Sequence, residues 1–160
     1  MQQVYWPCTS AARCLTRWLR NYSTLSSSVV FSQSDVNKFA DLSGDHNPIH
    51  IDTSSTSRYG KPIVHGVLML GHLSGVIATT YPNAVIHSMN VKFENYLHVN
   101  EEMLVKISKE KLRGVILQLD FSGIADTRQI FSGSVDVALP KNMARAVRSS
   151  LPDSPNLKIS

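Results

Sequence analysis

The sequence predicts an α+β fold in which an antiparallel sheet packs on one buried helix. Residues 64–80 are apolar on nearly all sides, which is typical of a helix inside the core. From residue 84 onward the pattern changes, and apolar and polar residues alternate as they do in amphipathic strands. With 160 residues, 42% hydrophobic and 18% charged, the chain has the length and composition of one domain with its own core.

The elements expected before the long helix are short. Residues 29–31 are predicted to form a strand, and Ser34 is predicted to cap a helix over residues 35–42. The stretch 43–59 is polar and rich in turn residues, so we expect a connection without regular structure. Connections of more than about 12–15 residues are usually functional or disordered, which draws attention to this segment.

Four strands are expected after the long helix, which should end before the dipeptide Tyr81-Pro82. Turn residues separate them at Asn100, at Arg113-Gly114 and at Ala125-Asp126. The predicted strands are residues 85–94, 102–108, 115–122 and 131–137. Residues 141–160 show little periodicity and are expected to form a loosely ordered tail, so the folded domain is assigned to residues 23–140.

Residues 1–22 are expected to be a mitochondrial transit peptide. They contain Arg13, Arg17 and Arg20 and no acidic residue, and their apolar residues recur at helical spacing on another face. Residues 20–23 resemble the cleavage pattern of matrix processing peptidases, so the mature chain is expected to start near Ser23 in the mitochondrial matrix. The alternative is a disordered N-terminus that carries no address.

Composition and motifs exclude several other classes of function. The net charge of +4 falls to +1 without the three arginines of the leader, so it does not indicate a nucleic-acid surface. Cys8 and Cys14 both lie in the leader, which excludes a disulfide framework and a Cys-based zinc site in the domain. No apolar run approaches the roughly 20 residues of a membrane-spanning helix. Neither G-x-G-x-x-G nor a P-loop occurs, so no nucleotide cofactor is predicted.

The candidate site begins with Asp45 and His50. Pro48 lies between them and prevents a continuous helix, so a tight bend can turn both side chains toward one point. A carboxylate and an imidazole that share a site can act as general acid and base near neutral pH. The alternative is an ordinary turn, because Gly-Asp-x-Asn-Pro is also a typical turn sequence.

Residues 62–66 lead directly from this region into the long helix. Gly66 has no side chain to keep a ligand from the N–H groups of the first helical turn, and a helix N-terminus favours an oxyanion. An acid–base pair that faces an oxyanion hole fits proton abstraction next to a carbonyl. His46 and His50 have the spacing of a helical metal pair, but Pro48 argues against that helix, and no metal site is predicted.

These motifs resemble those of the MaoC-like (R)-specific enoyl-thioester hydratases. Residues 45–52 are similar to the family pattern Asp-x-Asn-Pro-hydrophobic-His-x-Asp, and residues 62–66 are similar to Pro-Ile-hydrophobic-His-Gly before a buried helix. The resemblance covers residues 28–140. It implies a hot-dog fold, in which the sheet wraps the helix, and a homodimer whose active sites lie near the interface between the two joined sheets.

The resemblance also implies an activity and the roles of particular residues. The reaction would be the reversible syn dehydration of (3R)-hydroxyacyl thioesters of acyl carrier protein or coenzyme A to trans-2-enoyl thioesters. With the leader, this places the chain in mitochondrial type II fatty-acid synthesis, with no metal or organic cofactor. Asp45 and His50 would be catalytic, and a serine that hydrogen-bonds the aspartate would correspond to Ser74. The residues assigned to the oxyanion hole and substrate binding are Gly66, Ser74, Asn47 and His65.

Three points stay open at the level of the sequence. Position 46 is often aromatic or apolar in relatives, and His46 adds a second titratable group there. Arg58, Lys61 and Lys92 either meet an acidic carrier protein or a coenzyme A phosphate, or are ordinary solvated side chains. Two other functions also compete, a sensor that binds acyl thioesters without chemistry and a hot-dog thioesterase. A matched acid–base pair argues against the sensor, and the fold alone does not decide.

Overall fold

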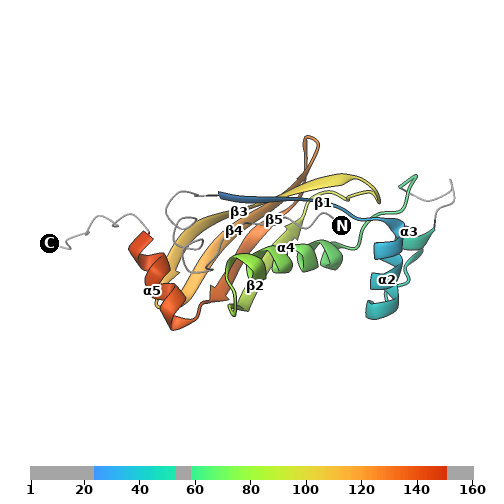
Figure 1. Ribbon diagram of the computed structural model, residues 1–160. Helices are drawn as coiled ribbons and strands as arrows, with labels where there is room; N and C mark the ends of the chain where they lie inside the picture. The colour runs from blue at the N-terminus through green and yellow to red at the C-terminus, as the bar shows by residue number, and fades with distance from the viewer. Residues whose placement is uncertain (1–23, 53–58, 151–160) are drawn as a thin grey trace, which may run out of the picture.

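The computed structural model describes residues 24–52 and 59–150 (Figure 1). The predicted leader and the chain beyond residue 150 lie outside the described residues. Within them, a five-stranded sheet curves over one long helix, α4 (Gly66–Thr80), and the two smaller helices that precede α4 lie together beyond one end of it (Figure 1). The predicted α+β class is confirmed.

The sheet is antiparallel throughout. Its strands, in the order in which they pair, are β1 (Thr24–Val30), β3 (Glu102–Arg113), β4 (Ile116–Ala125), β5 (Arg128–Ala138) and β2 (Val85–Phe93). The predicted turns are confirmed, since Asn100, Gly114 and Asp126 all have positive φ values, of 65°, 62° and 52°. Three strands are longer than predicted: β3 continues to the turn at Gly114, and β4 and β5 continue to the turn at Asp126.

The sheet buries alternate residues against α4. On β4 the apolar side chains Leu117, Leu119 and Phe121 are buried while their neighbours are partly exposed, as the period of two predicts. The edge strand β2 differs, because none of its residues is fully buried. In a single chain, the apolar side of β2 is therefore only partly covered.

Helix α4 starts two residues later than predicted. Ile63 and Val64 are extended instead, and the Val64 N–H donates to the Leu97 carbonyl (2.8 Å). The prediction that α4 is buried on nearly all sides is wrong for one chain alone. Its buried residues are Met69, Leu73 and Ile77, which recur every four positions and face the sheet. The remaining side of the helix is apolar but open.

The helix α2 (Gln33–Ser43) begins with a capping box, in which Ser32 and Asp35 bond each other's backbone N–H groups. The cap is thus Ser32, and the prediction of Ser34 is wrong because the partner carboxylate lies three residues after position 32. Two hydrogen bonds donated by Ser32, from its side chain and from its backbone N–H, lower the pKa of Asp35. The helix ends at Gly44, whose φ of 78° suits a residue without a side chain.

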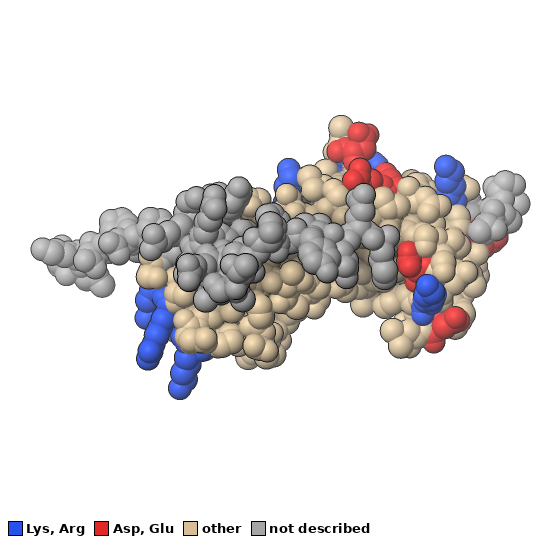
Figure 2. Space-filling view, in the orientation of Figure 1, with Lys and Arg blue, Asp and Glu red and all other residues tan. Residues whose placement is uncertain are grey.

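The predicted tail is wrong for residues 141–150, which form the helix α5 (Lys141–Ser150). Ala144 and Val147 are buried against the body of the protein, and Arg148 donates to the Gly114 carbonyl (3.0 Å). Met143 and Ala146 pack beside them, so this helix has one apolar face, with Lys and Arg side chains gathered at this end of the molecule (Figure 2). The helical period was therefore present in the sequence, but it spans only the 10 residues of α5. None of the helices in the two described ranges is long and apolar enough to cross a membrane.

Candidate active site

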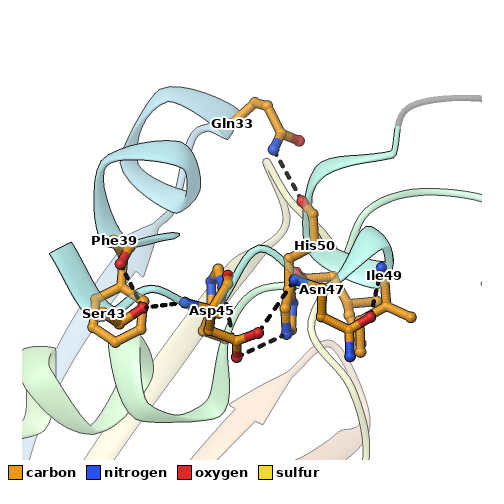
Figure 3. Close-up of polar contacts among 9 residues, drawn as sticks. Gln33, Phe39, Ser43, Asp45, Asn47, Ile49 and His50 are labelled. Atoms are coloured by element: carbon orange, nitrogen blue, oxygen red, sulfur yellow. Dashed lines mark hydrogen bonds and ion pairs between the residues drawn. The ribbon is translucent and has the colours of Figure 1, made fainter. Parts of the chain in front are cut away.

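Asp45 lies in a bend that follows α2. The Ser43 hydroxyl accepts a hydrogen bond from the Asp45 N–H (3.2 Å), and the Asp45 carboxylate accepts one from the Asn47 N–H (3.2 Å). The bend therefore satisfies part of its own backbone through short polar side chains. The Asp45 side chain remains 53% exposed and points toward His50 (Figure 3).

His50 lies on the short helix α3 (Pro48–Ile51), which the predicted connection did not include. The Asn47 side chain caps this helix by accepting from the Ile49 N–H (3.3 Å), and Pro48 occupies its first turn. Gln33 on α2 donates to the His50 carbonyl (3.0 Å), which fixes α3 against α2 (Figure 3). The predicted bend that brings Asp45 and His50 together is confirmed.

The His50 ring is buried, and its hydrogen bond identifies the ring nitrogen that carries a proton. Its Nδ1 lies 2.8 Å from the Ile63 carbonyl oxygen. Because a carbonyl only accepts, Nδ1 carries a proton and Nε2 is the nitrogen available toward Asp45. The Nε2 atom lies 3.8 Å from Asp45 Oδ2, which is too long for a direct hydrogen bond. One oxygen atom of a ligand can bridge the two groups.

His65 completes the cluster from the residue before α4. It is 2% exposed, and its Nε2 lies 3.0 Å from the Asp45 main-chain oxygen. The rings of His65 and His50 are stacked, with centroids 3.7 Å apart and planes at 25°. Three titratable side chains from three segments of the chain thus meet at one point.

This cluster also has the composition of a metal site. One donor atom from each of Asp45, His50 and His65 lies within 4.8 Å of the others. However, the bond from His65 Nε2 to a carbonyl oxygen requires a proton on that nitrogen, and a metal ligand must be deprotonated there. The donor set therefore fits acid–base chemistry better than metal binding.

The N-terminus of α4 lies beside the cluster and has no side-chain cap. His65 occupies the N-cap position but makes no side-chain cap, so the first N–H groups of α4 are not used by that residue's side chain. The Phe93 ring packs directly on Gly66, and a Cβ atom at position 66 would lie 2.8 Å from the Phe93 Cζ atom. Only glycine allows this close approach.

The other predicted site residues are not all part of the cluster. Ser74 lies about two turns further along α4, and among the described contacts no hydrogen bond joins it to Asp45. His46 pairs with Asp41 at 3.2 Å on the exposed side of α2. Lys61 and Lys92 are exposed, while Arg58 lies outside the described residues.

Three residues of the site have no signal in the sequence. The Ile63 carbonyl orients His50, the Phe39 ring packs on the ring of His65 with centroids 5.0 Å apart, and Phe93 covers Gly66. Each acts through a carbonyl or an apolar ring brought in by tertiary packing. Their residue types alone do not distinguish them from ordinary core residues.

The family is shown by comparison with known proteins. The MaoC like domain family matches residues 19–119, and the chain therefore belongs to this family. In structure, the chain is similar to the (R)-hydratase from A. caviae, with a TM-score of 0.70 and 26% identity over 73% of this chain and 94% of that one. A second neighbour, the R-hydratase PhaJ1 from Pseudomonas aeruginosa, has a TM-score of 0.69 and 22% identity and covers 74% and 80% of the two chains. The predicted hot-dog fold is confirmed.

Curated relatives match over a shorter span. The mitochondrial 3-hydroxyacyl-[acyl-carrier-protein] dehydratase of Arabidopsis thaliana is 31% identical over 86 residues, which is 52% of either chain. The (R)-specific enoyl-CoA hydratase of Aeromonas caviae is 30% identical over 87 residues, 52% of this chain and 65% of the relative. The chain thus spans about half to two thirds of the length of these relatives.

Proposed function

We propose that this protein is a hydro-lyase that interconverts (3R)-hydroxyacyl and trans-2-enoyl thioesters. The observation that carries the proposal is the Asp45–His50 pair, held 3.8 Å apart beside the uncapped N-terminus of α4. Relatives named as a 3-hydroxyacyl-[acyl-carrier-protein] dehydratase and as (R)-specific enoyl-CoA hydratases support the same reaction. The thioester itself acidifies the C2 proton, so the proposal includes no cofactor.

The oxyanion hole is assigned to the start of α4. Removal of the C2 proton builds negative charge on the thioester oxygen. The Gly66 N–H and the positive end of the α4 dipole would stabilise that charge as it forms. The absence of a side chain at position 66 leaves room for the Phe93 ring, which packs on this glycine and would line the approach to its N–H.

Asp45 and His50 divide the two proton transfers. In dehydration, one group takes the proton from C2, and the other donates a proton to the 3-hydroxyl, which leaves as water. In hydration, a water oxygen between Asp45 Oδ2 and His50 Nε2 is deprotonated by one group as it attacks C3, and the other group protonates C2. Both assignments balance the protons, and both use His50 Nε2 because Nδ1 is held by the Ile63 carbonyl.

The substrate carrier and location belong to the same proposal. The acid-free, Arg-rich first 22 residues and the mitochondrial relatives from Arabidopsis thaliana and Solanum lycopersicum support a role in the mitochondrial matrix, in type II fatty-acid synthesis. The acyl group would be carried by acyl carrier protein or coenzyme A. Exposed Lys61 and Lys92, with Arg58, are the proposed contacts to the acidic carrier or its phosphates.

A homodimer is also proposed, because two apolar surfaces are open in one chain. The open side of α4 carries Val67, 64% exposed, and two glycines, Gly71 and Gly75, at which a Cβ atom would meet nothing within 4 Å. The edge strand β2 exposes Val85 and Phe93. A second copy would cover both surfaces, since two edge strands can pair and two helices with small residues can pack closely.

The first experiment follows hydration of a trans-2-enoyl-CoA by the loss of conjugated absorbance, with chiral assignment of the product. Wild-type protein should give the (R)-hydroxy product, and Asp45→Asn and His50→Ala should each lower kcat by roughly 10²–10⁴-fold, the usual effect of losing a general acid or base. The matched control is His46→Ala, because this neighbouring histidine pairs with Asp41 outside the cluster.

Three other outcomes would contradict the proposed function. Turnover by folded Asp45→Asn and His50→Ala at the wild-type rate would overturn the assignment of the site. Release of free thiol from acyl-CoA, detected with a thiol dye, would identify a thioesterase instead. Binding without turnover of either coenzyme A or carrier-protein thioesters would identify a sensor.

A further inference from the structure

We propose that His65 is a positioning residue that holds Asp45 and His50 in their reactive arrangement. This inference rests on the proposed function and concerns how its acid–base pair is built. His65 occupies the N-cap of α4, a position where Ser, Thr, Asp or Asn would normally bond the first N–H groups of the helix. Its side chain makes no such cap and instead points back into the cluster.

The first connection is the hydrogen bond from His65 Nε2–H to the Asp45 main-chain carbonyl (3.0 Å). This bond spans 20 positions of the sequence. Within residues 24–52 and 59–150, the other hydrogen bonds of residues 44–47 join residues no more than five positions apart. The His65 bond therefore ties the exposed bend that carries Asp45 to the body of the protein.

The second connection is ring packing. The His65 ring lies against His50, with centroids 3.7 Å apart, and against Phe39 of α2, with centroids 5.0 Å apart. Because the ring is 2% exposed and contacts both neighbours, it has little freedom to rotate. One side chain thus fixes the backbone of Asp45 and the ring plane of His50 together.

The two histidines carry their protons on opposite ring nitrogens. His50 is protonated on Nδ1 because it faces the Ile63 carbonyl, and His65 on Nε2 because it faces the Asp45 carbonyl. The His65 Nδ1 atom is buried and has no hydrogen-bond partner within the described part of the chain. Nδ1 therefore makes no hydrogen bond within this part of the chain that would compete with the bond from Nε2, and that bond sets the orientation of the His65 ring.

Three substitutions separate the two connections. His65→Gln keeps an N–H donor for the Asp45 carbonyl, His65→Phe keeps a ring against His50, and His65→Ala removes both. We expect His65→Ala to lower kcat by about 10- to 100-fold, because a misplacement of about 1 Å can cost roughly 100-fold. The KM should change little, since His65 is buried and does not contact substrate in the proposed mechanism. His65→Gln should recover part of the loss.

The matched control is His72→Gln. This substitution removes a partly buried histidine of α4 that lies away from the cluster. It should leave kcat within about 2-fold of wild type. Thermal unfolding of every variant gives the folded fraction, so that a loss of kcat in folded His65→Ala is separated from a loss of protein. A folded His65→Ala with wild-type kcat would overturn the inference.

A readout without turnover distinguishes this inference from the proposed function. In ¹⁵N-labelled wild-type protein, the ring nitrogen shifts should report a proton on Nε2 of His65 and on Nδ1 of His50. In His65→Ala, which removes the ring that packs on His50, the His50 signals should shift toward a mixture of tautomers, whereas His65→Phe, which keeps a ring there, should retain them. Unchanged His50 signals in His65→Ala, or a proton on Nδ1 of His65, would overturn the positioning role even in a protein without hydratase activity.

Discussion

At the residue scale, Gly66 meets two requirements at once. It must present its N–H to a ligand, and it must accept the Phe93 ring, which a Cβ atom would approach to 2.8 Å. We predict that Gly66→Ala lowers kcat/KM by about 10²-fold, the order of magnitude of losing one oxyanion donor. Because Phe93 is 45% exposed, its ring can move, and the melting temperature should change little.

The double variant Gly66→Ala/Phe93→Leu identifies the cause. If the added methyl group blocks the N–H, activity stays low in the double variant. If the displaced Phe93 ring causes the loss, the smaller leucine restores activity, and the proposed role of the Gly66 N–H loses its support. Enoyl-CoA hydration and differential scanning fluorimetry measure the two effects.

How far the site was predictable also follows from individual residues. Asp45, His50 and Gly66 lie in short contiguous motifs whose chemistry can be read from residue type and spacing. The Ile63 carbonyl and the Phe39 ring reach the cluster only through tertiary packing. The direction of His46 was likewise not predictable, because it depends on Asp41 one helical turn back on α2.

At the scale of the element, the N-terminus of α2 offers a test with a built-in control. Ser32→Ala removes the capping box and should lower the free energy of unfolding by about 1 kcal/mol. Ser34 is next to Asp35, but it is exposed and lies outside the cap, so Ser34→Ala should lower the free energy of unfolding much less. Urea unfolding near pH 7 measures both, and equal losses would contradict the assignment of the cap to Ser32.

The contact between β1 and α4 should make stability depend on pH. His72 on α4 lies 3.2 Å from the Ser27 hydroxyl of β1, and burial lowers the pKa of His72 below its ordinary value. The unfolded chain then binds more protons than the folded chain, so stability is full above the ordinary pKa and falls as the pH drops through that range. We predict that the free energy of unfolding decreases between about pH 7.5 and pH 5.

Two variants assign this pH dependence. His72→Gln should flatten the decrease, because glutamine does not titrate. Ser27→Ala should lower stability at every pH and keep the decrease, since His72 remains buried. An unchanged decrease in His72→Gln, measured by urea unfolding across this pH range, would assign the effect to another group.

The elements also show where periodicity predicts structure well. Periodicity located β4 because one side of this strand packs on the core and the other side does not, so apolar and polar residues alternate along it. The prediction missed α5, although Met143, Ala144, Ala146 and Val147 form one apolar face, because this face extends over only a short helix. It also overstated the burial of α4, because an apolar helix looks the same whether its last face is covered by its own chain or by a second one.

At the scale of the whole molecule, the open face of α4 and the exposed edge strand β2 argue for a second copy. The chain has a mass of 17.7 kDa, and we predict that sedimentation gives a particle mass of about twice this value. Val67→Glu places a charge on the open face of α4 and should shift the equilibrium to the monomer, because a buried charge without a partner is costly. The matched control is Leu42→Glu on α2, an apolar residue that is 84% exposed and lies on neither surface. It should remain a dimer.

The same pair of variants connects assembly to activity. If the active sites depend on the interface, hydration by Val67→Glu should fall in proportion to the dimer fraction and recover at high protein concentration, while Leu42→Glu retains wild-type activity. Sedimentation velocity and enoyl-CoA hydration over one concentration series measure both quantities. A wild-type protein that sediments as a 17.7 kDa particle at every concentration would contradict the dimer. The apolar face of α4 would then need another partner, because an open apolar surface of this kind generally marks an interaction site.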